Sequence, residues 1–174
     1  MGGYMGCDIH IFIEFKVGDK PWTPDKHHVI RIDDDDIDSY HVREALSPRD
    51  YLMFAALAGV RGIGPDPKGV PKDVSELISK ALDNYGVDGH SHSYSSLKEL
   101  EQAMKATNRM PNKDIIEPKA FGSYPDYDNT WGHLLAYCKK TANELQLDLE
   151  IEKMILGPQY NSKVECRILY FFDN

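Results

Sequence analysis

Four side chains in two short segments have the types and the spacing that suit a metal ion. Asp8 and His10 lie two residues apart, and His90 and His92 have the same spacing. Side chains two apart on an extended segment point the same way, about 6–7 Å from each other along a strand. If the two pairs face one another, three imidazoles and one carboxylate form a ligand set suited to Zn, Mn, Ni or Fe. A divalent metal held there would acidify a bound water and neutralise phosphate oxygens.

The same histidines also suit chemistry without a metal. Imidazole titrates near neutral pH, so His10 could act as base or acid on a phosphodiester while His90 or His92 takes the other role. A structural interpretation stands beside these two. In it, His10 covers one face of a sheet, and the other two histidines fix a loop through hydrogen bonds to the backbone.

Two arginines and two tyrosines are candidates for binding a phosphorylated ligand. Arg61 opens a glycine- and proline-rich loop, Arg167 lies on the last expected strand, and a guanidinium can clamp phosphate with two hydrogen bonds. Tyr94 and Tyr124 border irregular segments, where an aromatic ring can stack on a base. Each has a structural alternative. Arg61 can pair with the end of the preceding helix, Arg167 with Glu14 on a neighbouring strand, and the tyrosines can anchor their loops.

A sheet is needed to position these side chains, and the first strand is clear in the sequence. The segment 7–17 alternates between apolar and mixed positions, which predicts a strand with Ile9 and Ile11 on one face and Asp8 and His10 on the other. Further strands are expected at 27–32, 148–156 and 164–172, the last two joined as a hairpin. Four helices are expected: one from Pro48 to Gly59 with Ser47 as its N-cap, one at 72–83, one after Ser95 or Ser96, and one at 129–145.

The order of these elements predicts an α+β fold in one domain spanning residues 1–174. A small antiparallel sheet, made of the N-terminal strand and the C-terminal hairpin, would carry three to four helices packed on it. The opposite face of such a sheet is either solvated or carries the site. The segments between the helices, 61–71, 83–94 and 107–128, are expected to be irregular.

Composition limits the classes of partner. The 174 residues include 20 Lys and Arg against 28 Asp and Glu, a net charge of −8, which opposes sequence-independent binding to duplex nucleic acid. No apolar run approaches the roughly 20 residues of a membrane span, so no membrane partner is expected. Cys7, Cys138 and Cys166 lack CxxC spacing, which predicts reduced thiols in a cytoplasmic protein, with Cys7 buried. The composition is compatible with both a monomer and a homo-oligomer.

Several blocks of the chain resemble a family of small, largely uncharacterised proteins encoded by bacteriophages and prophages. The blocks that carry the resemblance are MGCDIH, YLMFAALAGVRG, GVPKDVS, GHSHSYSSLKEL and the terminal RILYFFDN. The resemblance implies a compact fold and a setting in the cytoplasm of an infected or lysogenic bacterium. It implies no reaction. By analogy alone, phage proteins of this size modify nucleotides or blunt nucleotide-signalled host defences.

Two functional hypotheses follow. In the first, the protein is a His-dependent phosphoesterase, with or without a metal, acting on a nucleotide or cyclic nucleotide. In the second, it is a non-catalytic protein that sequesters such a nucleotide signal or a host protein as a counter-defence. The same arginines and tyrosines serve both hypotheses, and the histidines exchange protons only in the first.

Overall fold

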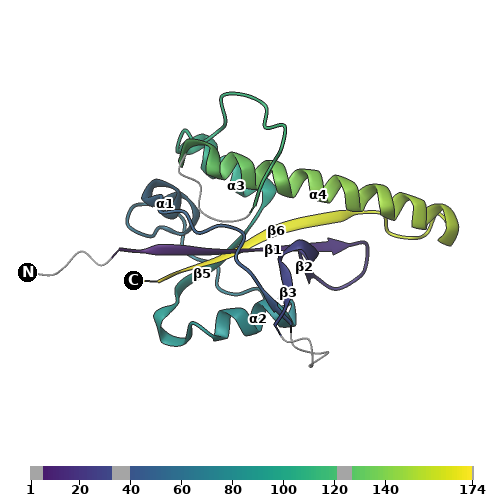
Figure 1. The fold of residues 1–174 in the computed structure, drawn as a ribbon, viewed down its shortest axis with the longest axis horizontal. Coiled ribbons are helices and arrows are strands. Elements are labelled where there is room, and N and C mark those ends of the chain that lie inside the picture. Colours follow the sequence, from purple (N-terminus) through teal and green to yellow (C-terminus); the bar gives the residue numbers. More distant parts are fainter. Residues whose placement is uncertain (1–5, 33–39, 121–126, 174) are drawn as a thin grey trace, which may run out of the picture.

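A four-stranded antiparallel sheet forms the centre of the computed structural model, which describes residues 6–32, 40–120 and 127–173. Across the sheet the strands run in the order β2 (Thr23–Pro24), β1 (Asp8–Val17), β6 (Val164–Asp173) and β5 (His90–Ser96) (Figure 1). A separate two-stranded sheet pairs β3 (Val29–Arg31) with β4 (Tyr40–Val42). Two single 3₁₀ turns are present, at Lys26–His28 and Gly86–Asp88. The α+β prediction is therefore confirmed.

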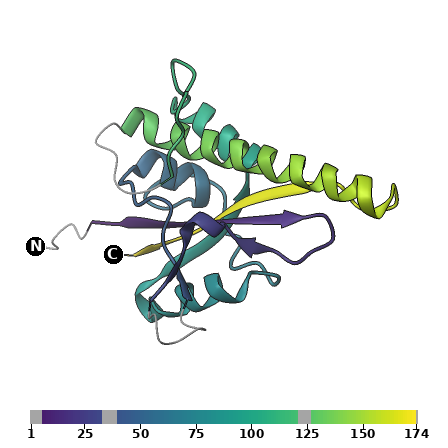
Figure 2. The same ribbon diagram turned by 45° about the vertical axis from the view of Figure 1, so that its right-hand side comes forward.

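Helices cover both faces of the sheet. One face packs against α1 (Tyr51–Ala58), α3 (Leu97–Ala106) and α4 (Tyr127–Leu156), and the other against α2 (Glu76–Asp83) and the β3–β4 pair (Figures 1 and 2). We expected the second face of the sheet to be solvated or to carry a site, but α2 and the β3–β4 pair cover much of it. The second face carries its own small core, and polar side chains lie beside it.

The alternation in β1 builds these two layers. Ile9, Ile11 and their odd-numbered neighbours join the larger core under α1, α3 and α4, as predicted. Phe12 lies on the opposite face and packs in the smaller core with Phe171 of β6 and Ile78 of α2. Because both faces are covered, β1 is buried over most of its length, including the polar side chains of His10 and Glu14. Cys7 is fully buried, as expected.

The expected C-terminal hairpin is wrong. Residues 148–156 form the end of α4, and β6 instead pairs with β1 along its whole length and with β5 on its other edge. The segment is rich in Glu, Leu, Lys and Met, which favour a helix, and nothing interrupts the helix before Gly157, where a φ of 103° suits only glycine. The alternation over the first few residues therefore mimics a strand.

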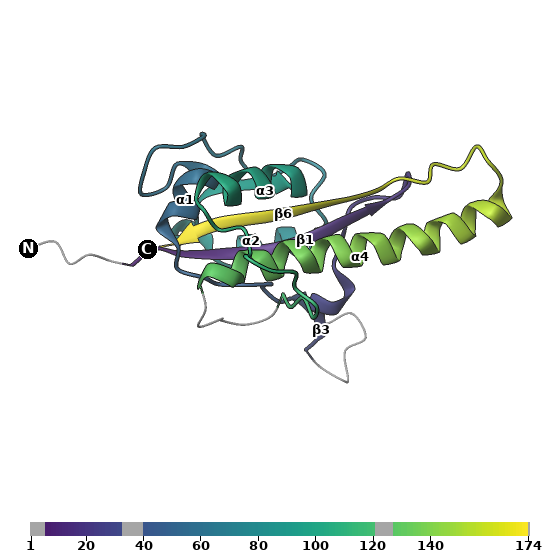
Figure 3. The ribbon, with the colours of Figure 1, turned by 90° about the horizontal axis from the view of Figure 1, so that it is seen from above.

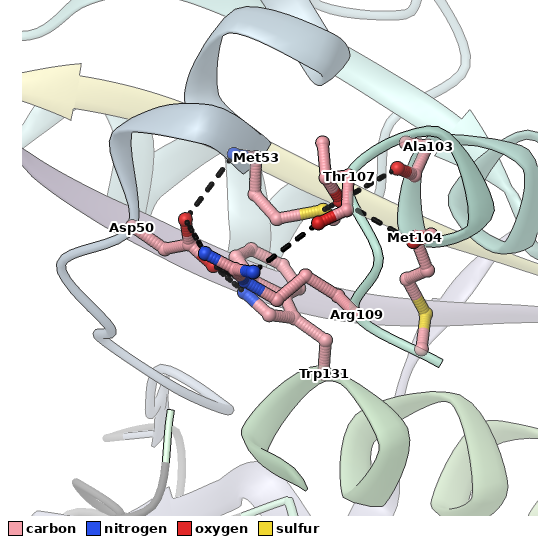
Figure 4. Close-up of polar contacts among 7 residues, drawn as sticks. All are labelled: Asp50, Met53, Ala103, Met104, Thr107, Arg109 and Trp131. Atoms are coloured by element: carbon pink, nitrogen blue, oxygen red, sulfur yellow. Dashed lines mark hydrogen bonds and ion pairs between the residues drawn. The ribbon is translucent and has the colours of Figure 1, made fainter. Parts of the chain in front are cut away.

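The starts of the helices are partly as predicted. Ser96 caps α3 through a capping box with Glu99, as one of the two expected candidates. Helix α2 begins at Glu76, four residues later than expected. The cap of α1 is Asp50 and not Ser47, because Asp50 is fixed from several sides (Figure 4).

The contacts of Asp50 join α1, α4 and the segment that follows α3. Its carboxylate accepts hydrogen bonds from the backbone N–H of Met53 at 3.4 Å, from Arg109 Nε at 2.8 Å and from Trp131 Nε1 at 3.0 Å (Figure 4). Asp50 and Trp131 are buried, and Trp131 lies on α4. This buried cluster therefore ties the start of α1 to α4 and to the segment that follows α3.

Candidate functional site

His10 lies between two carboxylates on the face of the sheet that α2 covers. Its Nδ1 is 2.8 Å from Glu44 Oε1, and its Nε2 is 3.1 Å from Asp173 Oδ2. Asp173 comes from the end of β6, beside the start of β1 in the antiparallel register. Glu44 is brought in by the segment after β4, which the hydrogen bond from the Ala45 N–H to the Ile11 carbonyl holds against β1.

Tyr85 completes this group from the turn that follows α2. Its hydroxyl donates to Glu44 Oε1 at 2.6 Å, and its ring packs 4.5 Å from the ring of His10 and 4.6 Å from that of Phe171. Burial and the neighbouring Glu44 carboxylate raise the pKa of Tyr85, so the phenol stays protonated as a donor. Glu44 therefore receives two hydrogen bonds on one oxygen.

The charges in this group are fixed by mutual contact. Burial favours neutral His10, but the Glu44 and Asp173 carboxylates outweigh it and raise the pKa of His10 above 6.5. Burial likewise favours protonated Glu44, but its contacts with His10 and Tyr85 outweigh it and lower the pKa of Glu44 below 4.5. These contacts thus favour the protonated form of His10, with Nδ1 hydrogen-bonded to Glu44 and Nε2 within ion-pair distance of Asp173.

A cavity of about 960 Å³ opens beside Glu44 and Tyr85. Its apolar walls come from four side chains: Phe12, Val42, Leu46 and Ala81. Its polar lining adds His41, Arg43, Ser47 and Asn84. The volume is at the upper end of the range of small-molecule sites, about 300–1,000 Å³, and the lining is more polar than is usual for them.

Two groups in this lining are available to a bound molecule. Both hydrogen bonds to Glu44 end on Oε1, and none of the described residues donates to Oε2. Arg43 is exposed and forms no ion pair within residues 6–32, 40–120 and 127–173. The cavity therefore presents a fixed anionic acceptor and a cationic donor to the same space.

The two histidines of β5 point to opposite faces of the sheet. His92 stacks on Phe171 at 5.2 Å, whereas His90 stacks on Phe172 at 6.2 Å, and consecutive residues of β6 face opposite sides. An irregularity in the pairing between His90 and Ser93 accounts for this, with Ser91 in the left-handed region at a φ of 53°. The prediction that His90 and His92 share one direction is wrong.

His10 and His92 do share a face, but Phe171 separates them. The His10 ring stacks on Phe171 at 4.7 Å from the β1 side, and His92 stacks from the β5 side. Two strand spacings put these imidazoles about 10 Å apart. Burial, together with His90, lowers the pKa of His92 below 6.5, so His92 is neutral at pH 7.

The predicted metal cluster is not formed. Asp8 pairs instead with Arg49 at 2.7 Å, and His90 lies across the sheet from His10 and His92. Within the part of the chain that the structure describes, no group of three or more His, Cys, Asp or Glu is arranged to hold a metal ion. The predicted metal site at Asp8, His10, His90 and His92 is therefore wrong.

Arg167 follows its structural alternative. Its guanidinium binds Glu14 Oε2 at 2.7 Å on the neighbouring strand, binds Asp73 Oδ1 at 2.8 Å and lies 3.9 Å from the centre of the Trp22 ring. Glu14 is fully buried and also accepts a 2.7 Å hydrogen bond from the Ser75 N–H. All three guanidinium nitrogens are engaged by Glu14 and Asp73, so the described structure supports a structural role for Arg167 rather than phosphate binding.

The other ligand candidates lie apart from the Glu44 cavity. Tyr94 packs beside Arg167, with ring and guanidinium 5.7 Å apart. Arg61 lines a different cavity, between α1 and α3, with its guanidinium 5.7 Å from the ring of Tyr51. Tyr124 lies outside the described residues. Among the predicted site residues that the structure describes, only His10 is in direct contact with the group that borders the Glu44 cavity.

Sequence reasoning did not find Glu44, Arg43 or Asp173 as site residues. Asp173 carried a usable signal, because antiparallel pairing of the first and last strands places it beside His10. Glu44 and Arg43 had none, since the segment that holds them follows a short strand and shows no periodicity.

No model of a known protein family, no curated protein and no solved structure matches this chain. The resemblance to phage proteins therefore stays a prediction. None of the described helices combines the length and the apolar character needed to cross a membrane.

Proposed function

We propose that the protein captures a small phosphorylated ligand of the nucleotide class in the Glu44 cavity and releases it unchanged. The observation that carries the proposal is the ionised Glu44 carboxylate, held through Oε1 by His10 and Tyr85 in the wall of a cavity that Arg43 also lines. A carboxylate oxygen accepts hydrogen bonds from ribose hydroxyls or base amino groups, and a guanidinium binds phosphate. The apolar walls suit a planar base.

Capture is favoured over hydrolysis because the residues near the cavity are poor at moving protons. His10 has both ring nitrogens on carboxylates, so neither is open to a ligand. A lowered pKa makes Glu44 a weak general base at neutral pH. His92 is neutral and suitable as a base, but Phe171 lies between it and His10. The proposed role is therefore sequestration of a nucleotide signal, in the bacterial cytoplasm that the resemblance implies.

The test is calorimetric titration with a panel of nucleoside monophosphates and cyclic nucleotides, followed by chromatography of the recovered ligand. We expect saturable one-to-one binding by at least one member of the panel, with that ligand recovered intact. Conversion of the ligand to a hydrolysed product would overturn capture in favour of the phosphoesterase. Absence of binding by the whole panel would overturn the ligand class. Inorganic phosphate serves as the control for binding by charge alone.

Two variants assign the binding to the cavity. Arg43→Ala should weaken binding at least tenfold by removing the phosphate contact, which corresponds to roughly 1.4 kcal/mol. Its matched control is Lys98→Ala, which removes one positive charge from an exposed position on α3, outside this cavity. Equal losses in the two variants would indicate long-range attraction and contradict a contact at Arg43.

A further inference from the structure

A second cavity, of about 690 Å³, lies between α1 and α3 on the face of the sheet opposite the Glu44 group. Figure 3 shows these two helices side by side. The volume is within the range of small-molecule sites, about 300–1,000 Å³, and a mostly apolar lining is their usual composition. Here the apolar side chains of the lining include Leu52, Ala55, Leu57, Ile63 and Ala106.

One wall of this cavity is the loop that follows α1, and close packing on Ala55 fixes its start. A Cβ added at Gly62 would lie 2.8 Å from Ala55 Cβ, and one added at Gly64 would overlap the Ala55 carbonyl oxygen. Further along the loop, the Lys68 N–H donates to Ser93 Oγ on β5 at 3.1 Å. The loop is therefore attached to α1 at its start and to β5 further on, which makes the cavity a preformed one.

Ser95 is a buried polar side chain in the lining of this cavity. It is 4% exposed, and its Oγ lies 2.9 Å from the Tyr170 hydroxyl. Tyr170 donates its single hydroxyl hydrogen to the Leu57 carbonyl at 3.1 Å, so the hydrogen between Tyr170 and Ser95 must come from Ser95. The Ser95 hydroxyl can therefore accept a further hydrogen bond but has no hydrogen left to donate.

The charged side chains in this lining balance one another. Lys68 and Glu99 form an ion pair at 2.6 Å, and the lining adds one further charge of each sign, on Arg61 and Asp66. An ionic ligand gains little from such a lining, because its attraction to one charge is offset by its repulsion from the opposite one. The balance favours an uncharged ligand, in contrast to the ligand proposed for the Glu44 cavity.

We infer that this cavity binds a small, uncharged and largely apolar molecule that donates a hydrogen bond to Ser95. Binding would remove from water the apolar side chains of Leu52 and Ile63, which are exposed in the free protein. Indole represents this class, because it has an apolar ring system, no charge and one N–H group. The inference does not depend on the proposed nucleotide binding, because the two cavities share no residue.

The test is a titration of the ¹⁵N-labelled chain with indole and with 1-methylindole, the matched molecule that lacks the N–H. We expect saturable shifts in the backbone signals of residues 51–57, 61–68 and 102–107, which surround the cavity. Indole should bind about fivefold more tightly than 1-methylindole, because it alone donates to the Ser95 hydroxyl.

Two variants assign the binding to this cavity. Ser95→Ala should lower the affinity for indole to that for 1-methylindole, whereas Ser79→Ala, on α2 and outside the cavity, should keep the preference. Ala106→Phe fills the cavity from an exposed position on α3, so it should weaken the binding of both molecules at least tenfold while the melting temperature stays unchanged.

Four results would overturn the inference. The first is the absence of saturable shifts with indole up to its solubility limit. The second is equal affinity of the wild type for the two molecules, or a preference that survives in Ser95→Ala. The third is unchanged binding by Ala106→Phe. The fourth is a set of shifts centred on residues 41–47, which would place indole in the Glu44 cavity.

Discussion

Two carboxylates in this protein are held by hydrogen bonds from several side chains but differ in how many of their oxygens are used. Asp50 uses both oxygens: Oδ1 accepts from Met53 and Arg109, and Oδ2 accepts from Arg109 and Trp131. Glu44 accepts from His10 and Tyr85 on Oε1 alone, and it lines a cavity. The first group is saturated and holds helices together. The second has no described donor on Oε2, and in the proposed function this oxygen receives the ligand.

Removing Asp50 should give the largest loss of stability. Asp50→Ala leaves the Arg109 guanidinium and the buried Trp131 N–H without their acceptor, at a cost of about 3–5 kcal/mol in the free energy of unfolding. Urea unfolding followed by Trp fluorescence measures this cost. The control is Asp8→Ala, which breaks an exposed pair with Arg49 and should cost at most about 1 kcal/mol. Equal costs would contradict the structural role of Asp50.

Glu44→Gln should lower the affinity for nucleotide more than it lowers the stability of the fold. The amide keeps the size of the side chain but loses the charge that a ligand and His10 both contact, so nucleotide affinity should fall at least tenfold, or roughly 1.4 kcal/mol. Calorimetric titration measures the affinity and urea unfolding the stability. Glu144→Gln, on the exposed side of α4, is the matched control. A variant that unfolds readily yet binds as wild type would place Glu44 with the structural acids.

The contribution of His10 to stability should depend on pH, which a comparison of wild type with His10→Gln can show. Because the pKa of His10 is raised above 6.5, its contribution is complete below about pH 6.5 and is lost as the pH rises through the raised pKa. The difference in unfolding free energy between wild type and His10→Gln should therefore shrink from neutral to alkaline pH. A difference that grows with pH would mean that His10 is neutral in the folded state.

NMR titration of the wild-type imidazole signals compares two histidines in one molecule. His10 should titrate above its ordinary pKa of 6.5 and His92 below it, since His10 faces carboxylates and His92 is mainly desolvated. Coincident titrations would contradict the different environments of the two rings.

Tyr85→Phe should give the smallest effect. It removes one of the two hydrogen bonds to Glu44 Oε1 and leaves the ring that packs on His10, so stability should fall by about 1 kcal/mol. Nucleotide affinity should fall only a few-fold, because Oε2 is untouched. Urea unfolding and calorimetric titration measure the two effects, and a loss of affinity as large as that of Glu44→Gln would mean that the ligand contacts the phenol directly.

Local patterns predicted the parts of this fold that depend on local physics. The alternation in β1, the cap at Ser96 and the pairing of Arg167 with Glu14 follow from side-chain periodicity and strand register. Residues 148–156 were ambiguous because a few alternating positions fit a strand as well as a helix. Packing of the segment against its neighbours decided between them.

The candidate site depended on contacts that no local pattern contains. The turn of direction between His90 and His92 comes from one strained residue, Ser91, in an otherwise extended segment. Glu44 reaches His10 because the segment after β4 crosses beside β1. Both features are set by tertiary structure, so local patterns predicted the wrong partners for His10.

The location of the bound nucleotide tests the central claim most directly. Backbone ¹⁵N–¹H spectra of the wild type would be recorded while the tightest-binding nucleotide of the panel is added. The account predicts that the largest shifts fall in residues 41–47 and 81–85, around Glu44 and Arg43. Shifts centred instead on residues 61–68, beside the cavity between α1 and α3, would contradict it.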